Sequence, residues 1–89
     1  MNTLHHAPTF NEIRKQIITG ITAEYQRQPL DDKHIVESIS QAAMLAPLAG
    51  ISTTEYLRCA ISGLTRAGAP RKVINAVAGY YMSVILEDE

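Results

Sequence analysis

The side chains that most often carry chemistry, histidine, cysteine and paired carboxylates, are few and scattered in this chain. His5 and His6 are adjacent near the N-terminus, whereas His34 has no spaced set of cysteine, histidine or carboxylate ligands around it. A metal site needs several ligands that converge on one ion, so this pattern predicts no bound metal. Cys59 has no positioned histidine and no basic cluster of its own, and we interpret it as a packing residue rather than a reactive thiol.

Sequence motifs for catalysis and cofactor binding are missing as well. The chain has no glycine-rich phosphate loop, no nucleophile with a base at a readable spacing, and no pair of carboxylates within an apolar run. A helical protein of 89 residues also has little room for a pocket of a few hundred Å³. We therefore expect no enzymatic activity and no cofactor.

Basic residues, by contrast, are unevenly distributed along the chain. Residues 56–86 contain no acidic side chain and four basic ones, although the whole chain has a net charge of −1. These basic residues are Arg58, Arg66, Arg71 and Lys72. Arg71 and Lys72 fall in the first turn of a predicted helix, where the positive helix end disfavours each cation by about 0.3–1 kcal/mol. The four residues are therefore our candidates for an anion or nucleic-acid site.

Length and composition predict a single helical domain. The chain has 89 residues, of which 46% are hydrophobic and 19% charged, enough for one domain with a thin core. Residues 1–8 show no hydrophobic period and are predicted to form a flexible tail, whereas residues 9–89 form the domain. A single cysteine excludes an internal disulfide framework and favours a reducing compartment. Neither a signal-peptide pattern nor a membrane-length apolar run is present, so we expect a cytoplasmic protein without a membrane partner.

Hydrophobic residues recur with a helical period along the rest of the chain. We predict helices over 9–27, 32–46, 53–67 and 70–86. Thr9 and Ser52 each open a capping box, because the residue three positions later is a glutamate. Gly68 suits the C-terminal end of the third helix, and Pro70 suits the first position of the fourth. Gly20 lowers the propensity of the first helix without an evident reason.

The predicted fold is all-α: a small domain resembling a four-helix bundle, whose last two helices form an antiparallel hairpin. Small residues recur four apart on both of these helices. On the third helix they are Cys59, Gly63 and Ala67, and on the fourth they are Asn75, Gly79 and Ser83. Because small side chains let two helix backbones approach closely, we predict that the two stripes face each other.

The fourth helix carries more apolar surface than a small core can cover. Its apolar arc is about 160° wide, whereas a helix on one side of a core needs a stripe of about 100°. The surplus predicts self-association, with a homodimer as the expected form. The predicted interaction surface consists of Tyr80, Tyr81, Met82, Ile85 and Leu86. Off the apolar face of the second helix, a smaller apolar patch is formed by Met44, Leu45 and Leu48.

Two hypotheses about function follow from these patterns. The first is a small non-enzymatic regulator or adaptor, which presents a helical surface to a protein partner that the sequence does not identify. The alternative is a DNA-binding transcriptional regulator, in which residues 60–79 form a helix-turn-helix and Arg71 and Lys72 enter the major groove. Convergence of the four basic residues on one exposed face favours the second hypothesis, and exposure of the residues 80–82 favours the first.

Overall fold

The structure is a computed structural model, which describes residues 8–87 of the chain. Those residues form four α-helices and one short 3₁₀ turn, with no β-strand among them. The elements are α1 (Phe10–Arg27), α2 (Asp32–Leu45), the turn η1 (Ala46–Ala49), α3 (Thr53–Arg66) and α4 (Arg71–Glu87). The all-α class and the four helices are confirmed, and every boundary falls within one residue of its predicted position. Apart from Pro8, the predicted tail over residues 1–8 lies outside the described residues.

The helix starts follow the predicted caps, with one difference. At α1 the capping box is complete, because Thr9 Oγ1 accepts from the Glu12 N–H at 3.1 Å and the Glu12 carboxylate accepts from the Thr9 N–H at 2.7 Å. At α3 only half of the predicted box forms: Ser52 Oγ accepts from the Glu55 N–H at 3.0 Å. The Glu55 carboxylate turns instead toward Arg14 of α1. The Glu55 side chain, predicted to cap α3, therefore helps to hold α1 against α3.

The turn between α3 and α4 explains why the two helices form a hairpin. Gly68 has a φ of 77°, a left-handed conformation that costs glycine almost nothing. The Ala69 N–H donates to the Leu64 carbonyl at 3.0 Å, and the Gly68 N–H donates to the Thr65 carbonyl at 3.1 Å. This pair of bonds is a Schellman motif, which satisfies the last carbonyls of α3 and reverses the chain. Pro70 stands one position before the helix, where its carbonyl accepts the first bonds of α4.

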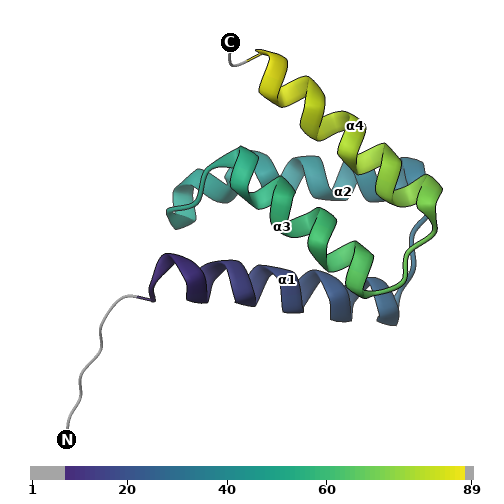
Figure 1. Cartoon of the computed structure of the whole chain (residues 1–89), viewed down its shortest axis with the longest axis horizontal. Coiled ribbons are helices and arrows are strands. Elements are labelled where there is room, and N and C mark those ends of the chain that lie inside the picture. Colours follow the sequence, from purple (N-terminus) through teal and green to yellow (C-terminus); the bar gives the residue numbers. More distant parts are fainter. Residues whose placement is uncertain (1–7, 88–89) are drawn as a thin grey trace, which may run out of the picture.

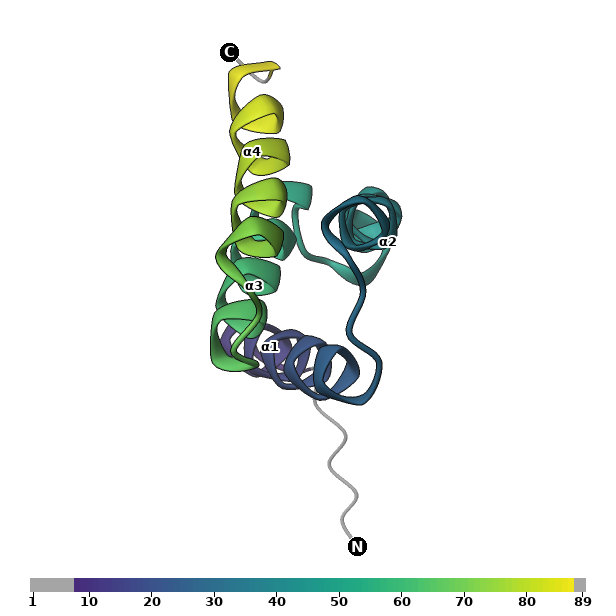
Figure 2. The ribbon, with the colours of Figure 1, turned by 90° about the vertical axis from the view of Figure 1, so that its right-hand side faces the viewer.

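Helix α3 lies at the centre of the arrangement, and the other three helices pack on it (Figure 1). Helix α1 runs in the same direction as α3, whereas α2 and α4 run in the opposite direction (Figure 1). The predicted antiparallel hairpin of the last two helices is therefore confirmed. Helices α2 and α4 also pack on each other, whereas the backbone of α1 comes close to only one other helix, α3 (Figure 2).

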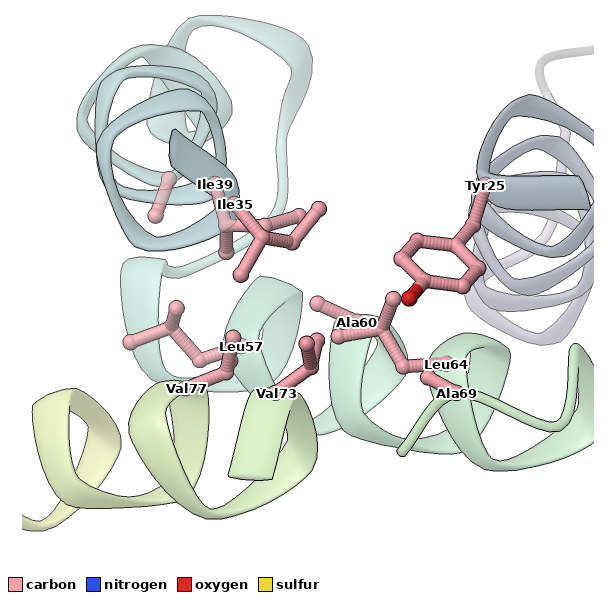
Figure 3. Close-up of a cluster of buried hydrophobic side chains, with 10 residues drawn as sticks. Tyr25, Ile35, Ile39, Leu57, Ala60, Leu64, Ala69, Val73 and Val77 are labelled. Atoms are coloured by element: carbon pink, nitrogen blue, oxygen red, sulfur yellow. The ribbon is translucent and has the colours of Figure 1, made fainter. Parts of the chain in front are cut away.

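The hydrophobic core reflects this asymmetry. Leu57 and Leu64 of α3 and Val77 of α4 are fully buried, and Ile35 and Ile39 of α2 cover them from one side (Figure 3). Helix α1 contributes a single fully packed residue to the cluster, Tyr25, which reaches in from the opposite side (Figure 3). Most of the core is thus made by α2, α3 and α4, and α1 is attached at its edge.

Close packing of α1 on α3 depends on Gly63. A Cβ atom added there would lie 2.9 Å from Ile21 Cγ2 and 3.0 Å from the Ile18 carbonyl oxygen, both on α1. Thr22 Oγ1 of α1 donates toward the Gly63 carbonyl at 3.1 Å across the same crossing. The prediction that the two small-residue stripes face each other is therefore wrong. Gly63 faces α1 because that crossing has no room for a side chain, whereas Gly79 faces open space.

Candidate interaction surfaces

The predicted interaction surface on α4 is divided between the core and the solvent. Tyr80, Tyr81 and Ile85 are half-buried, and the two tyrosines pack against the core cluster. Met82 and Leu86 point outward, with 53% and 67% of their surfaces exposed. The five residues therefore do not form one continuous exposed face. Only Met82 and Leu86 are largely exposed and available to a partner without rearrangement.

Met82 and Leu86 share their exposed side of α4 with two residues that were expected to pack inward. Asn75 and Gly79 are exposed as well, and no atom lies within 4 Å of a Cβ added at Gly79. At about 100° per residue, these four positions fall within an arc of about 60°. We call Asn75, Gly79, Met82 and Leu86 the outer stripe of α4.

The four basic candidates do not converge on one place. Arg66, Arg71 and Lys72 lie around the α3–α4 turn, are exposed, and make no ion pair with any residue in the range 8–87. Arg58 lies eight residues before Arg66 on α3, about 12 Å away along the helix axis. Arg66, Arg71 and Lys72 therefore share one turn, and Arg58 lies about two helical turns away from it.

Arg58 belongs instead to a polar network that connects three helices. Arg14 of α1 places its Nε 2.7 Å from Glu55 Oε2, and Arg58 Nη1 lies 3.8 Å from Glu55 Oε1. Arg58 Nε also donates a hydrogen bond of 2.7 Å to the Tyr81 hydroxyl of α4, which raises the pKa of Arg58 further above its already high ordinary value. The structure thus joins Arg58 and Tyr81, residues that the sequence suggested for two different sites.

An apolar groove lies between α1 and α2, above α3. It forms because the backbones of both helices come close to α3 and not to each other, and its volume is about 330 Å³. Its apolar lining comes mainly from Ile17, Ile21, Tyr25, Leu30, Ile35 and Ile39. Tyr25 and Ile35 face each other across this space in Figure 3. The expectation that so small a protein has little room for a pocket of this size is therefore wrong.

The rim and floor of the groove are only weakly polar. Gln16, Gln28 and Ser38 bring uncharged polar groups to the rim, and the one charged lining residue, Glu24, is paired with Arg27. Tyr56 contributes to the floor from α3, and burial raises the pKa of its hydroxyl. The groove therefore offers contact area to an apolar group and almost no charge.

The sequence predicted the two helices that flank the groove but not the space between them. One signal was present in Gly20, whose low helix propensity had no evident reason. Gly20 lines the groove, and no atom lies within 4 Å of a Cβ added there. A glycine at such a position lets another backbone approach α1 closely.

Residues 44–48 form a third exposed apolar surface at the end of α2. Met44, Leu45 and Leu48 expose 70%, 62% and 86% of their surfaces. This matches the predicted apolar patch in position. Exposed side chains of this size often mark a contact surface when they form a continuous patch.

Cys59 and His34, the side chains with potential reactivity, both have contacts that explain them as parts of the fold. Cys59 is fully buried, burial raises the pKa of its thiol, and the neighbouring Arg14 guanidinium opposes that shift. His34 Nδ1 lies 2.7 Å from Asp31 Oδ1, the carboxylate that caps α2. His5 and His6 lie outside the described residues.

Comparison with protein-family models, curated proteins and solved structures finds no match for the chain. Within residues 8–87, no helix is both long enough and apolar enough to cross a membrane. Any function must therefore be inferred from the chain's own surfaces.

Proposed function

We propose that this protein is a small, non-enzymatic regulator or adaptor of the cytoplasm, which acts as a homo-oligomer and binds a helix of a protein partner. The observation that carries this proposal is the apolar groove between α1 and α2. Two helices that flank a third usually pack on each other and bury their facing side chains. Here Tyr25, Ile35 and Ile39 are already buried, whereas Ile17, Ile21 and Leu30 stay half-buried beside an open groove, which a third apolar surface can fill.

The shape of the groove fits a helix better than a compact small molecule. Along α1 its lining runs from Gln16 to Gln28, a distance of about 18 Å or three helical turns. An amphipathic helix in such a groove places apolar residues three and four positions apart against both walls. Gly20 stands about one helical turn after Gln16 on this wall, where the absence of a side chain permits close approach.

A matched pair of arginine substitutions on α1 tests the groove. Gly20→Arg places a long charged side chain at the groove, and its Cβ atom meets no atom within 4 Å. Ala23→Arg adds the same charge to an exposed position of α1 that does not line the groove. Both variants should keep the wild-type helical content in circular dichroism.

The readouts are the binding of an uncharged apolar fluorescent dye, Nile red, and the recovery of partners from the native source with and without nuclease. We expect Gly20→Arg to lower both dye binding and the recovery of protein partners. Ala23→Arg should behave as the wild type, and nuclease should leave the recovered proteins unchanged. Equal behaviour of the two variants would exclude the groove as the binding site.

A second candidate function, DNA binding through residues 60–79, is supported by Arg66, Arg71 and Lys72 at the α3–α4 turn. All three are exposed and unpaired among the described residues. Three phosphate contacts give only modest affinity, which falls steeply with salt. We expect Arg71→Ala with Lys72→Ala to abolish duplex binding at about 50 mM salt. No binding by the wild type under these conditions would eliminate this candidate.

A further inference from the structure

The exposed side of α4 lacks the charges that normally keep a surface helix in water. From Val73 to Leu86 the helix has no charged residue on any face. A helix of this kind is normally covered on most sides. Helices α2 and α3 cover its inner side, where Val73 and Val77 are buried, but the outer stripe is uncovered.

The outer stripe has the spacing of a helix-pairing seam. Asn75, Gly79, Met82 and Leu86 follow one another at intervals of four, three and four residues, which is the spacing of the core positions in a coiled coil. Gly79 provides a gap into which a large side chain from a facing helix can fit. In an antiparallel pair, Gly79 of one helix lies opposite Met82 of the other, and Asn75 lies opposite Leu86.

Charges at the two ends of α4 specify the direction of the facing helix. Lys72 and Glu87 lie on the same flank of the outer stripe, about 50° and about 110° from its centre. They are 15 residues apart, so about 22 Å along the axis separates them within one helix. In an antiparallel pair, equivalent flanks meet, and Lys72 of each helix lies beside Glu87 of the other. A parallel pair would leave Lys72 of each helix about 22 Å along the axis from Glu87 of the other, too far for an ion pair.

We propose that the outer stripe of α4 binds the same stripe of a second copy of this chain in an antiparallel homodimer, with two Lys72–Glu87 ion pairs across it. This inference deepens the proposed function by naming the partner at α4, and it leaves the α1–α2 groove free. One helix seam is smaller than the roughly 800 Å² per partner of a standard interface, so we expect micromolar affinity.

Sedimentation equilibrium from about 1 µM to about 500 µM tests the pairing. The wild type should change from monomer to dimer within this range. Met82→Glu and Leu86→Glu should each remove the dimer, because they place a carboxylate in the seam. Both positions are exposed in the monomer, so circular dichroism should show unchanged helical content.

A charge exchange tests the direction. Lys72→Glu should weaken the dimer about fivefold or more at low salt, and adding Glu87→Lys should restore most of the affinity. The two side chains cannot reach each other within one helix, so recovery reports a contact between chains. Lys15→Glu on α1 changes the net charge equally and should have no effect.

Three results would overturn the proposal: a wild-type monomer at every concentration, a dimer that survives Met82→Glu and Leu86→Glu, or no recovery in the charge exchange. Dye binding in the groove is measured on the same variants. If a variant loses the dimer but still binds the dye, the result concerns the α4 contact and leaves the groove proposal unchanged. Equal dye binding by Gly20→Arg and Ala23→Arg contradicts the groove whatever the oligomeric state.

Discussion

Gly63→Ala should loosen the attachment of α1, even though alanine is the better helix former. The added methyl carbon would lie 2.9–3.0 Å from Ile21 and from the Ile18 carbonyl oxygen. These contacts involve backbone and the branch point of a stiff side chain, so α1 itself must shift. Overpacking of this kind costs about 1–3 kcal/mol, whereas the gain in helix propensity is about 1 kcal/mol. We therefore expect a net loss of about 1 kcal/mol.

The assay is thermal unfolding combined with amide hydrogen exchange. A loss of about 1 kcal/mol lowers the Tm of a domain of this size by about 4–8 °C. Because the backbone of α1 comes close to only one other helix, α3, the amides of α1 should lose protection before those of α2 and α4. The close contacts occur between α1 and α3, so the loss of protection should be largest in α1 and smaller in α2 and α4.

Gly20→Ala is the matched control. Gly20 also lies within a helix, but its position is open, so the methyl group meets nothing. This substitution should raise stability by about 0.5–1 kcal/mol through helix propensity and the reduced entropy of the unfolded chain. If Gly63→Ala raises the Tm as Gly20→Ala does, the close approach of α1 to α3 at Gly63 is refuted.

Two further predictions concern the helix ends. Gly68→Ala should lower the free energy of unfolding by about 1–2 kcal/mol, because the φ of 77° forces a Cβ into a strained conformation, and chemical denaturation at unchanged m-value measures this loss. The hydrogen bond to Asp31 raises the pKa of His34, so its contribution to stability is complete below about pH 6.5 and is lost as the pH rises through the raised pKa. His34→Gln should remove that pH dependence from thermal unfolding, and a histidine titration by NMR should give a pKa above the ordinary value. An unshifted titration would show that the Asp31 contact does not form in solution.

The sequence was sufficient to predict the helices, because their signals are local. Thr9 and Glu12 are three residues apart and close a capping box without help from the rest of the chain. Gly68 supplies a left-handed residue wherever its neighbours lie, so the hairpin turn was predictable too. The residues Leu57, Leu64 and Val77, which are fully buried, also follow the apolar period of their helices.

Which faces meet was decided only by the tertiary structure, because a helical period gives the direction of a side chain but not its neighbour. The small residue Gly63 had two possible neighbours, and it faces α1 rather than α4 because the Ile18–Thr22 segment fits there. In the sequence, the apolar faces of α1 and α2 cannot be distinguished from faces that pack into a core. They line a groove because α3 holds the two helices apart, and the outer stripe of α4 is exposed because α2 and α3 already occupy its other side.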